Sequence, residues 1–108
     1  MKKLLLLLIV PFVSFGQGWI QFYETEGSRF NYVIQTNDGG YATTGQDIML
    51  LKTDANGNLL GYQIFDSGYS VGNCIKQTND GGYIVAGYNV LEDYPCMRLT
   101  KYDVNGYL

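Results

Sequence analysis

The sequence predicts an all-β fold built from antiparallel four-stranded repeats. A seven-residue motif occurs twice without change, at residues 35–41 and 77–83, which gives an offset of 42 residues. Residues that favour strands alternate with turn residues around both copies. Outside residues 1–16, no stretch has the i, i+3, i+4, i+7 apolar spacing of an amphipathic helix. These observations disfavour a long helical bundle and a parallel α/β sheet.

Residues 1–16 have the layout of a secretory signal peptide. Two lysines precede an unbroken apolar run at residues 4–10, and Ser14 and Gly16 supply small residues at the cleavage positions. A transmembrane anchor is the alternative, but a generous reading of the run gives residues 4–15, against the ~20 apolar residues of a spanning helix. We therefore expect cleavage after Gly16 and a secreted or cell-surface chain. No cysteine lies near this site, so a lipid anchor is not indicated.

The charge and composition of the remaining chain narrow its partners. Without its first 16 residues the chain keeps five basic and ten acidic residues, a net charge of −5. Nucleic acids and anionic membranes therefore lose their electrostatic attraction. The chain has no histidine, which excludes a Ser-His-Asp triad, a Cys-His pair, a His-ligated zinc and a His-bound haem within it. We expect no catalytic residue, no cofactor and no metal.

Each copy of the motif predicts a β-hairpin. In the first copy, residues 32–36 and 41–44 are rich in aromatic and β-branched residues, as strands are. The residues between them tolerate the positive φ of a tight turn. These turn residues are Asp38, Gly39 and Gly40 in the first copy and Asp80, Gly81 and Gly82 in the second.

Two more strands are predicted after the first hairpin, at residues 48–53 and 59–65. The turn between them contains Asn56 and Gly57, a pair favoured in hairpins. Four strands in about 42 residues are the content of one blade of a β-propeller. Residues 19–23 precede the first hairpin as residues 62–65 precede the second, so we expect them to form a further strand, which would close a blade.

The second repeat contains an insertion. Lys101 lies 49 residues after its counterpart Lys52, so seven residues are added between Gly87 and Lys101. Loops on repeat scaffolds often carry recognition, and a tolerated surface insertion is the alternative. The candidate recognition residues are Glu92, Asp93 and Tyr94.

The repeated motifs resemble those of a known group of proteins. Gln-Thr-x-Asp-Gly-Gly-Tyr-x-x-x-Gly, followed by Leu-x-Lys-x-Asp-x-Asn-Gly-x-Leu, is similar to the tandem blades of large secreted bacterial proteins. Both elements occur in residues 35–59 and again in residues 77–108. The resemblance implies β-propeller blades, often followed by a C-terminal secretion-sorting domain. It implies no particular activity, because many functions are carried on such blades.

Three groups of residues suggest chemistry, and each has a structural alternative. Asp38 and Asp80 could serve as the two carboxylates of a glycosidase, or could bind backbone N–H groups in their turns. Asp54, Asn56 and Asn58 have the spacing of the first calcium ligands of an EF-hand, but Leu59 and Phe65 stand where Gly and Glu are required. We therefore favour structural turns at both places.

The cysteines and tyrosines leave further alternatives open. Secretion permits a disulfide between Cys74 and Cys96, but one strand is expected between them, a distance of ~9.6 Å against the ~7 Å that a disulfide allows. We favour no bond, unless the insertion folds back over the first strand. The ten tyrosines suit sugar stacking or an adhesive interface, and equally suit packing within strands, which we favour.

The sequence thus predicts a non-catalytic scaffold or binding module, an incomplete β-propeller of about two repeats within residues 17–108. Protein or carbohydrate partners would bind through its loops. Repeats of this kind share their cores, and ~3 or more are usually needed for stability. We therefore expect a fragment of a longer protein that self-associates through open sheet edges. The N-terminal blades of an extracellular glycan hydrolase and a cell-surface adhesin are the alternatives.

Overall fold

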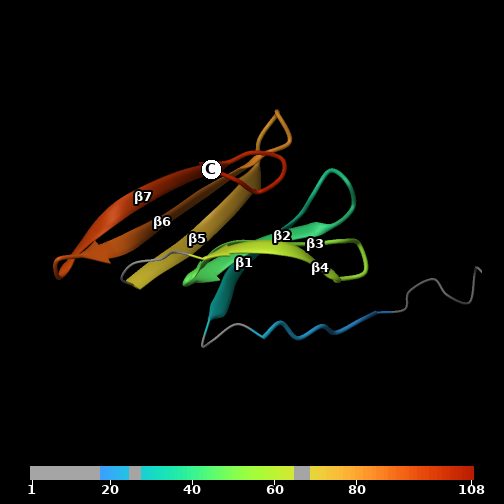
Figure 1. Cartoon of the computed structure of the whole chain (residues 1–108), viewed down its shortest axis with the longest axis horizontal. Helices are drawn as coiled ribbons and strands as arrows, with labels where there is room; N and C mark the ends of the chain where they lie inside the picture. The colour runs from blue at the N-terminus through green and yellow to red at the C-terminus, as the bar shows by residue number, and fades with distance from the viewer. Residues whose placement is uncertain (1–17, 25–27, 65–68) are drawn as a thin grey trace, which may run out of the picture.

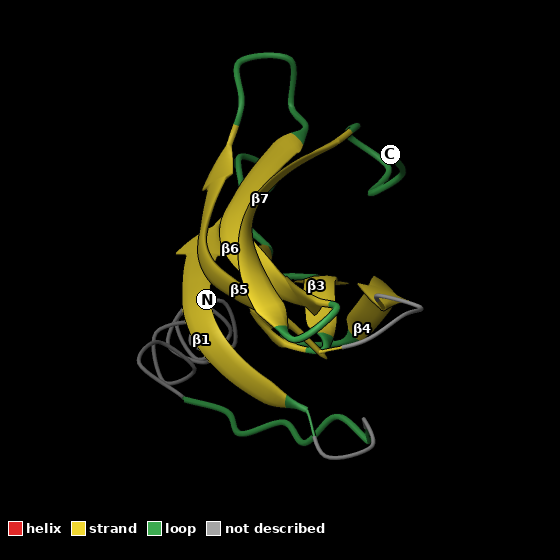
Figure 2. Cartoon of the chain, turned by 90° about the vertical axis from the view of Figure 1, so that its left-hand side faces the viewer, coloured by secondary structure: helices red, strands yellow, loops and turns green. Residues whose placement is uncertain are grey.

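The computed structural model describes residues 18–24, 28–64 and 69–108, and every regular element in these ranges is a β-strand (Figure 2). All strand pairings are antiparallel, so the predicted all-β class is confirmed. The strands are β1 (Arg29–Gln35), β2 (Tyr41–Gln46), β3 (Ile48–Thr53), β4 (Leu59–Ile64), β5 (Tyr69–Gln77), β6 (Tyr83–Leu91) and β7 (Tyr94–Tyr102).

The strands pair in chain order as two meanders. In the first meander β1 pairs with β2, β2 with β3 and β3 with β4; in the second, β5 pairs with β6 and β6 with β7. The meanders are joined where Gln46 of β2 pairs with Val71 of β5. The result is one open sheet in the order β4-β3-β2-β5-β6-β7, with β1 also beside β2 (Figure 1).

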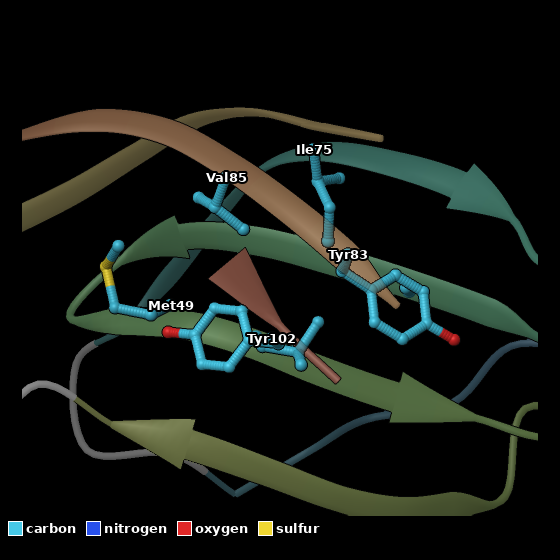
Figure 3. Close-up of a cluster of buried hydrophobic side chains, with 7 residues drawn as sticks. Met49, Ile75, Tyr83, Val85 and Tyr102 are labelled. Atoms are coloured by element: carbon cyan, nitrogen blue, oxygen red, sulfur yellow. The ribbon is translucent and has the colours of Figure 1, made fainter. Parts of the chain in front are cut away.

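The hydrophobic core belongs to both meanders at once. Its buried members are Ala42, Met49 and Leu50 from the first meander and Ile75, Tyr83, Val85 and Tyr102 from the second (Figure 3). Full burial of a side chain such as Ile75 or Val85 contributes ~1.5–3 kcal/mol to folding. Because each meander supplies only part of this cluster, neither has a complete core of its own.

Two glycines stand where the backbones approach too closely for a side chain. β1 and β5 each have an irregularity in register at equivalent places. A Cβ at Gly45 would lie 1.7 Å from the carbonyl oxygen of Arg29, and one at Gly87 would lie 1.9 Å from that of Val71. The two glycines lie 42 residues apart, and so do the carbonyl groups that they contact, so the repeat preserves this backbone contact as well as the sequence.

The segment at residues 19–23 is not a strand, and the prediction of a closing strand there was wrong. Instead, the segment crosses the turn between β3 and β4. The ring of Trp19 lies edge-on to Tyr41 with centroids 5.8 Å apart, and the Tyr23 hydroxyl donates a hydrogen bond to the Gly57 carbonyl at 2.5 Å. Side-chain contacts, rather than a backbone ladder, hold it in place.

The insertion in the second repeat does not form a separate loop. It lengthens β6 and β7 to nine residues each, against six in β2 and β3. Leu91 pairs with Tyr94, and the two residues between them have positive φ, 49° at Glu92 and 69° at Asp93. Two central residues with positive φ form the tight turn whose twist matches that of a hairpin. The expected recognition loop is therefore a hairpin tip.

The two cysteines are unbonded. Cys74 of β5 pairs with Ala86 of β6, whereas Cys96 of β7 pairs with Asn89, farther along β6. β6 thus lies between them, as expected, and their positions along it also differ.

Within the described ranges, no helix has the length and apolar character required to cross a membrane. The predicted signal peptide and its cleavage site lie outside the described residues, as does Phe65 at the predicted end of β4.

Candidate functional site

Asp38 and Asp80 occupy equivalent turns, where each accepts hydrogen bonds from its own neighbours. Oδ1 of Asp38 accepts the backbone N–H of Gly40 at 3.0 Å, and Oδ1 of Asp80 accepts that of Gly82 at 2.9 Å. The threonine hydroxyl two residues earlier donates to the same oxygen in both turns. Asp80 also forms an ion pair with Lys101, at 3.1 Å.

The electrostatics of these turns disfavour acid catalysis. The threonine hydroxyl, then the glycine N–H, hold the pKa of both carboxyls below the usual range, and Lys101 lowers the pKa of Asp80 further. A glycosidase acid, however, needs a raised pKa to stay protonated. The two turns are also joined by a hydrogen bond, which the Asn37 backbone N–H donates to Gln77 Oε1 at 2.8 Å. The arrangement supports two ionised, hydrogen-bonded turn residues.

Asp54 organises the turn between β3 and β4 in the same way. Its Oδ1 accepts the N–H groups of Asn56 and Asn58 at 2.9 Å each, and its Oδ2 accepts the Asn58 side-chain amide at 3.0 Å. The amide of Asn58 is the main cause that lowers the pKa of Asp54. Asp103 accepts from the two equivalent N–H groups after β7, and Gly57 takes a φ of 83°. In the described ranges, no cluster of three or more His, Cys, Asp or Glu side chains is arranged to hold a metal ion.

An aromatic groove of about 580 Å³ lies on the first meander. It lies over the sheet face opposite to the one that carries Ala42, because successive side chains of a strand point to opposite faces. Its lining residues are Trp19, Tyr23, Phe30, Asn31, Tyr32, Val33, Tyr41, Thr43, Leu51 and Thr53. The apolar side chain of Val33 in this groove is 62% exposed.

The segment before β1 forms one wall of the aromatic groove. Trp19 lies against Gly57, where a Cβ would come within 2.4 Å of the indole ring. Tyr23 is anchored at the carbonyl of the same glycine and packs edge-on against Phe30, with centroids 6.1 Å apart. Glycine at position 57 thus allows both the positive φ of the turn and the close approach of the Trp19 ring.

The polar groups beside the groove are already paired. Asn31 donates from Nδ2 to the Gly72 carbonyl at 3.0 Å, and the Thr43 hydroxyl donates to the Tyr32 carbonyl at 2.6 Å. Burial, and then the negative charge of Asp54, raise the pKa of Tyr23, which stays neutral at physiological pH. The groove therefore suits an apolar or aromatic surface better than a charged ligand.

The structure does not bring the predicted recognition residues to this groove. Glu92, Asp93 and Tyr94 lie at the turn between β6 and β7, at the left end of Figure 1, whereas residues 18–24 run below β4 at the right. Tyr94 is 74% exposed. Sequence reasoning missed the groove because it assigned residues 19–23 to a strand. Trp19 beside two further aromatic residues was the available signal.

Comparison with protein-family models, with curated proteins and with solved structures gave no match to this chain. The resemblance of its motifs to tandem propeller blades stays a prediction.

Proposed function

We propose that the chain is a non-catalytic, secreted β-repeat module that acts as a scaffold or a binding surface, with its meanders serving as blades of a propeller-like assembly. One observation carries this proposal. The repeated aspartates Asp38, Asp80, Asp54 and Asp103 all accept backbone N–H groups in their own turns. The recurrence of these residues is thus explained by the fold, without a reaction.

The aromatic groove supports the binding part of the proposal. Planar rings such as Trp19, Tyr32 and Tyr41 offer rigid apolar area to a protein surface or to the face of a sugar ring. An adhesin would use the same surface. A glycosidase centred on Asp38 and Asp80 has less support, because the pKa values of both carboxyls are lowered.

The function is tested by presenting the full chain with a panel of polysaccharides. Reducing ends report hydrolysis. Binding is followed by the fluorescence of Trp19, the single tryptophan of the chain. We expect no more hydrolysis than the Asp38→Asn/Asp80→Asn double variant shows. Turnover that this variant loses, while its circular dichroism and melting stay cooperative, would contradict the proposal and favour a glycosidase that uses Asp38 and Asp80.

A further inference from the structure

The contact between the two meanders joins different faces of equivalent strands. At the 42-residue offset, Val33 corresponds to Ile75, yet Val33 is 62% exposed and Ile75 is fully buried. At the 49-residue offset, Leu50 corresponds to Leu99, yet Leu50 is 1% exposed and Leu99 is 71% exposed. The first meander therefore contributes the face of Leu50, and the second contributes the opposite face, that of Ile75.

Among the described residues, such a contact leaves one face of each meander uncovered by the other meander. On the first meander this is the aromatic groove, whose Val33 and Tyr41 correspond to the buried Ile75 and Tyr83. On the second meander it is the face of Leu99, which also carries Met97, 98% exposed, by strand alternation. We define the outer face as Ala86, Met97, Leu99 and Lys101.

From this symmetry we propose that the outer face of one chain docks into the aromatic groove of a second copy, head to tail. The inference rests on the proposed function as a repeat module. A second copy is the expected partner of the groove, because the contact between the two meanders inside one chain already joins a face like that of Leu50 to a face like that of Ile75. Contacts of this kind close into a ring or extend into a filament, according to the rotation between copies.

Individual contacts inside the chain predict those between copies. Lys52 lies over the ring of Tyr83, with its Nζ 5.3 Å from the centroid. The corresponding pair between copies is Lys101 over Tyr41. Thr44 fills the space above Gly72. In the proposed contact Ala86 takes the place of Thr44 and Phe30 takes that of Gly72, so a smaller side chain faces a larger one.

Trp19 already occupies part of the groove. A Cβ at Gly106 would lie 3.3 Å from the side chain of Leu50, and at the equivalent Gly57 the nearest side chain is that of Trp19. Docking of Leu99 at this position therefore displaces Trp19, and its fluorescence reports the event.

Two complementary variants test the proposal in the full chain. Leu99→Glu blocks the outer face and leaves the groove intact, whereas Val33→Glu blocks the groove and leaves the outer face intact. Both side chains are largely exposed. By analytical ultracentrifugation we expect wild type to associate with concentration, each variant alone to be weakened at least tenfold, and an equimolar mixture to form a 1:1 dimer that grows no further. The Trp19 emission should shift in the mixture and in associated wild type, and should stay unchanged in either variant alone.

The controls separate docking from general effects of charge and folding. Tyr94→Glu places a charge on the opposite face of β7 and should associate as wild type does. Met97→Glu repeats the outer-face test at a second exposed position, should Leu99→Glu fold poorly. A monomeric wild type, or a mixture that stays monomeric, would overturn the docking without bearing on hydrolysis, on which the proposed function is judged. Self-association of both variants at wild-type strength would overturn it too and would favour edge pairing.

Discussion

The ammonium group of Lys52 lies over the ring of Tyr83, 5.3 Å from its centroid, and donates a hydrogen bond to the Val104 carbonyl at 2.9 Å. One side chain of the first meander thus makes two contacts with the second. We predict that Lys52→Met lowers the free energy of unfolding by ~0.5–1.5 kcal/mol, because it removes both contacts and keeps the aliphatic stem. Urea unfolding measures the change. Lys76→Met, at an exposed position of β5, is the control and should be neutral.

The close contacts of Gly45 and Gly87 lead to a second prediction. Alanine at either position would bring a Cβ within 2 Å of a carbonyl oxygen, so the strands have to separate. We expect Gly45→Ala and Gly87→Ala each to cost ~1–3 kcal/mol of stability, the range of overpacked sites. Gly61→Ala is the matched control, since nothing lies within 4 Å of its added Cβ. Equal effects at Gly61 and Gly45 would contradict the explanation.

The aspartate turns predict a loss of stability in acid. The pKa values of Asp38, Asp54 and Asp80 are lowered in the folded chain, so the unfolded chain binds more protons once the pH falls below about 4. Their contribution is present at neutral pH and disappears as the pH drops through the folded pKa values. Melting temperatures between pH 7 and pH 2.5 should fall steeply at the acid end. An Asp38→Asn/Asp80→Asn double variant should have a lower melting temperature at pH 7 and lose less of it towards pH 2.5. If its melting temperature fell with pH as steeply as that of wild type, these aspartates would not be the cause of the acid loss.

Trp19 competes with the proposed docking of a second copy. We predict that Trp19→Ala strengthens self-association several-fold while it lowers the melting temperature of the monomer, because it frees the groove and removes the contact with Tyr41. Sedimentation and differential scanning calorimetry give the two readouts. Weaker association would show instead that Trp19 belongs to the docking surface.

The separation of Cys74 and Cys96 predicts two free thiols in the oxidised, purified chain. Cys96 is exposed and should react quickly with a thiol reagent, whereas the half-buried Cys74 should react slowly. Mass spectrometry after alkylation without reductant should show two labels per chain. A single unlabelled, cross-linked species would require β5 and β7 to be adjacent.

Local chemistry made part of this fold predictable from sequence. The predicted strand at residues 48–53 coincides with β3, because apolar residues there end at a turn whose Asp54 and Gly57 have strong local preferences. The predictions failed where distant contacts decide. Residues 19–23 have the composition of a strand, yet Trp19 packs against Tyr41 and Tyr23 donates a hydrogen bond to Gly57. No local sequence pattern encodes these distant contacts.

The candidate site was harder to predict for the same reason. The aromatic groove joins residues before β1 with residues of β2 and β3, and its exposure depends on which face the second meander covers. The sequence alone assigns Val33 and Ile75 the same environment, and only the packing separates them. The insertion likewise offered no sign that Leu91 and Tyr94 would pair and extend the hairpin.

The shared core has a consequence for the order of events during synthesis. β2 and β3 leave the ribosome before β5, β6 and β7, so Ala42, Met49 and Leu50 emerge before Ile75, Tyr83, Val85 and Tyr102 exist to cover them. For that interval the nascent chain displays an apolar strand pair, the kind of surface that chaperones bind and that aggregates when left uncovered. Folding of the first meander is therefore completed only once the second meander has been translated.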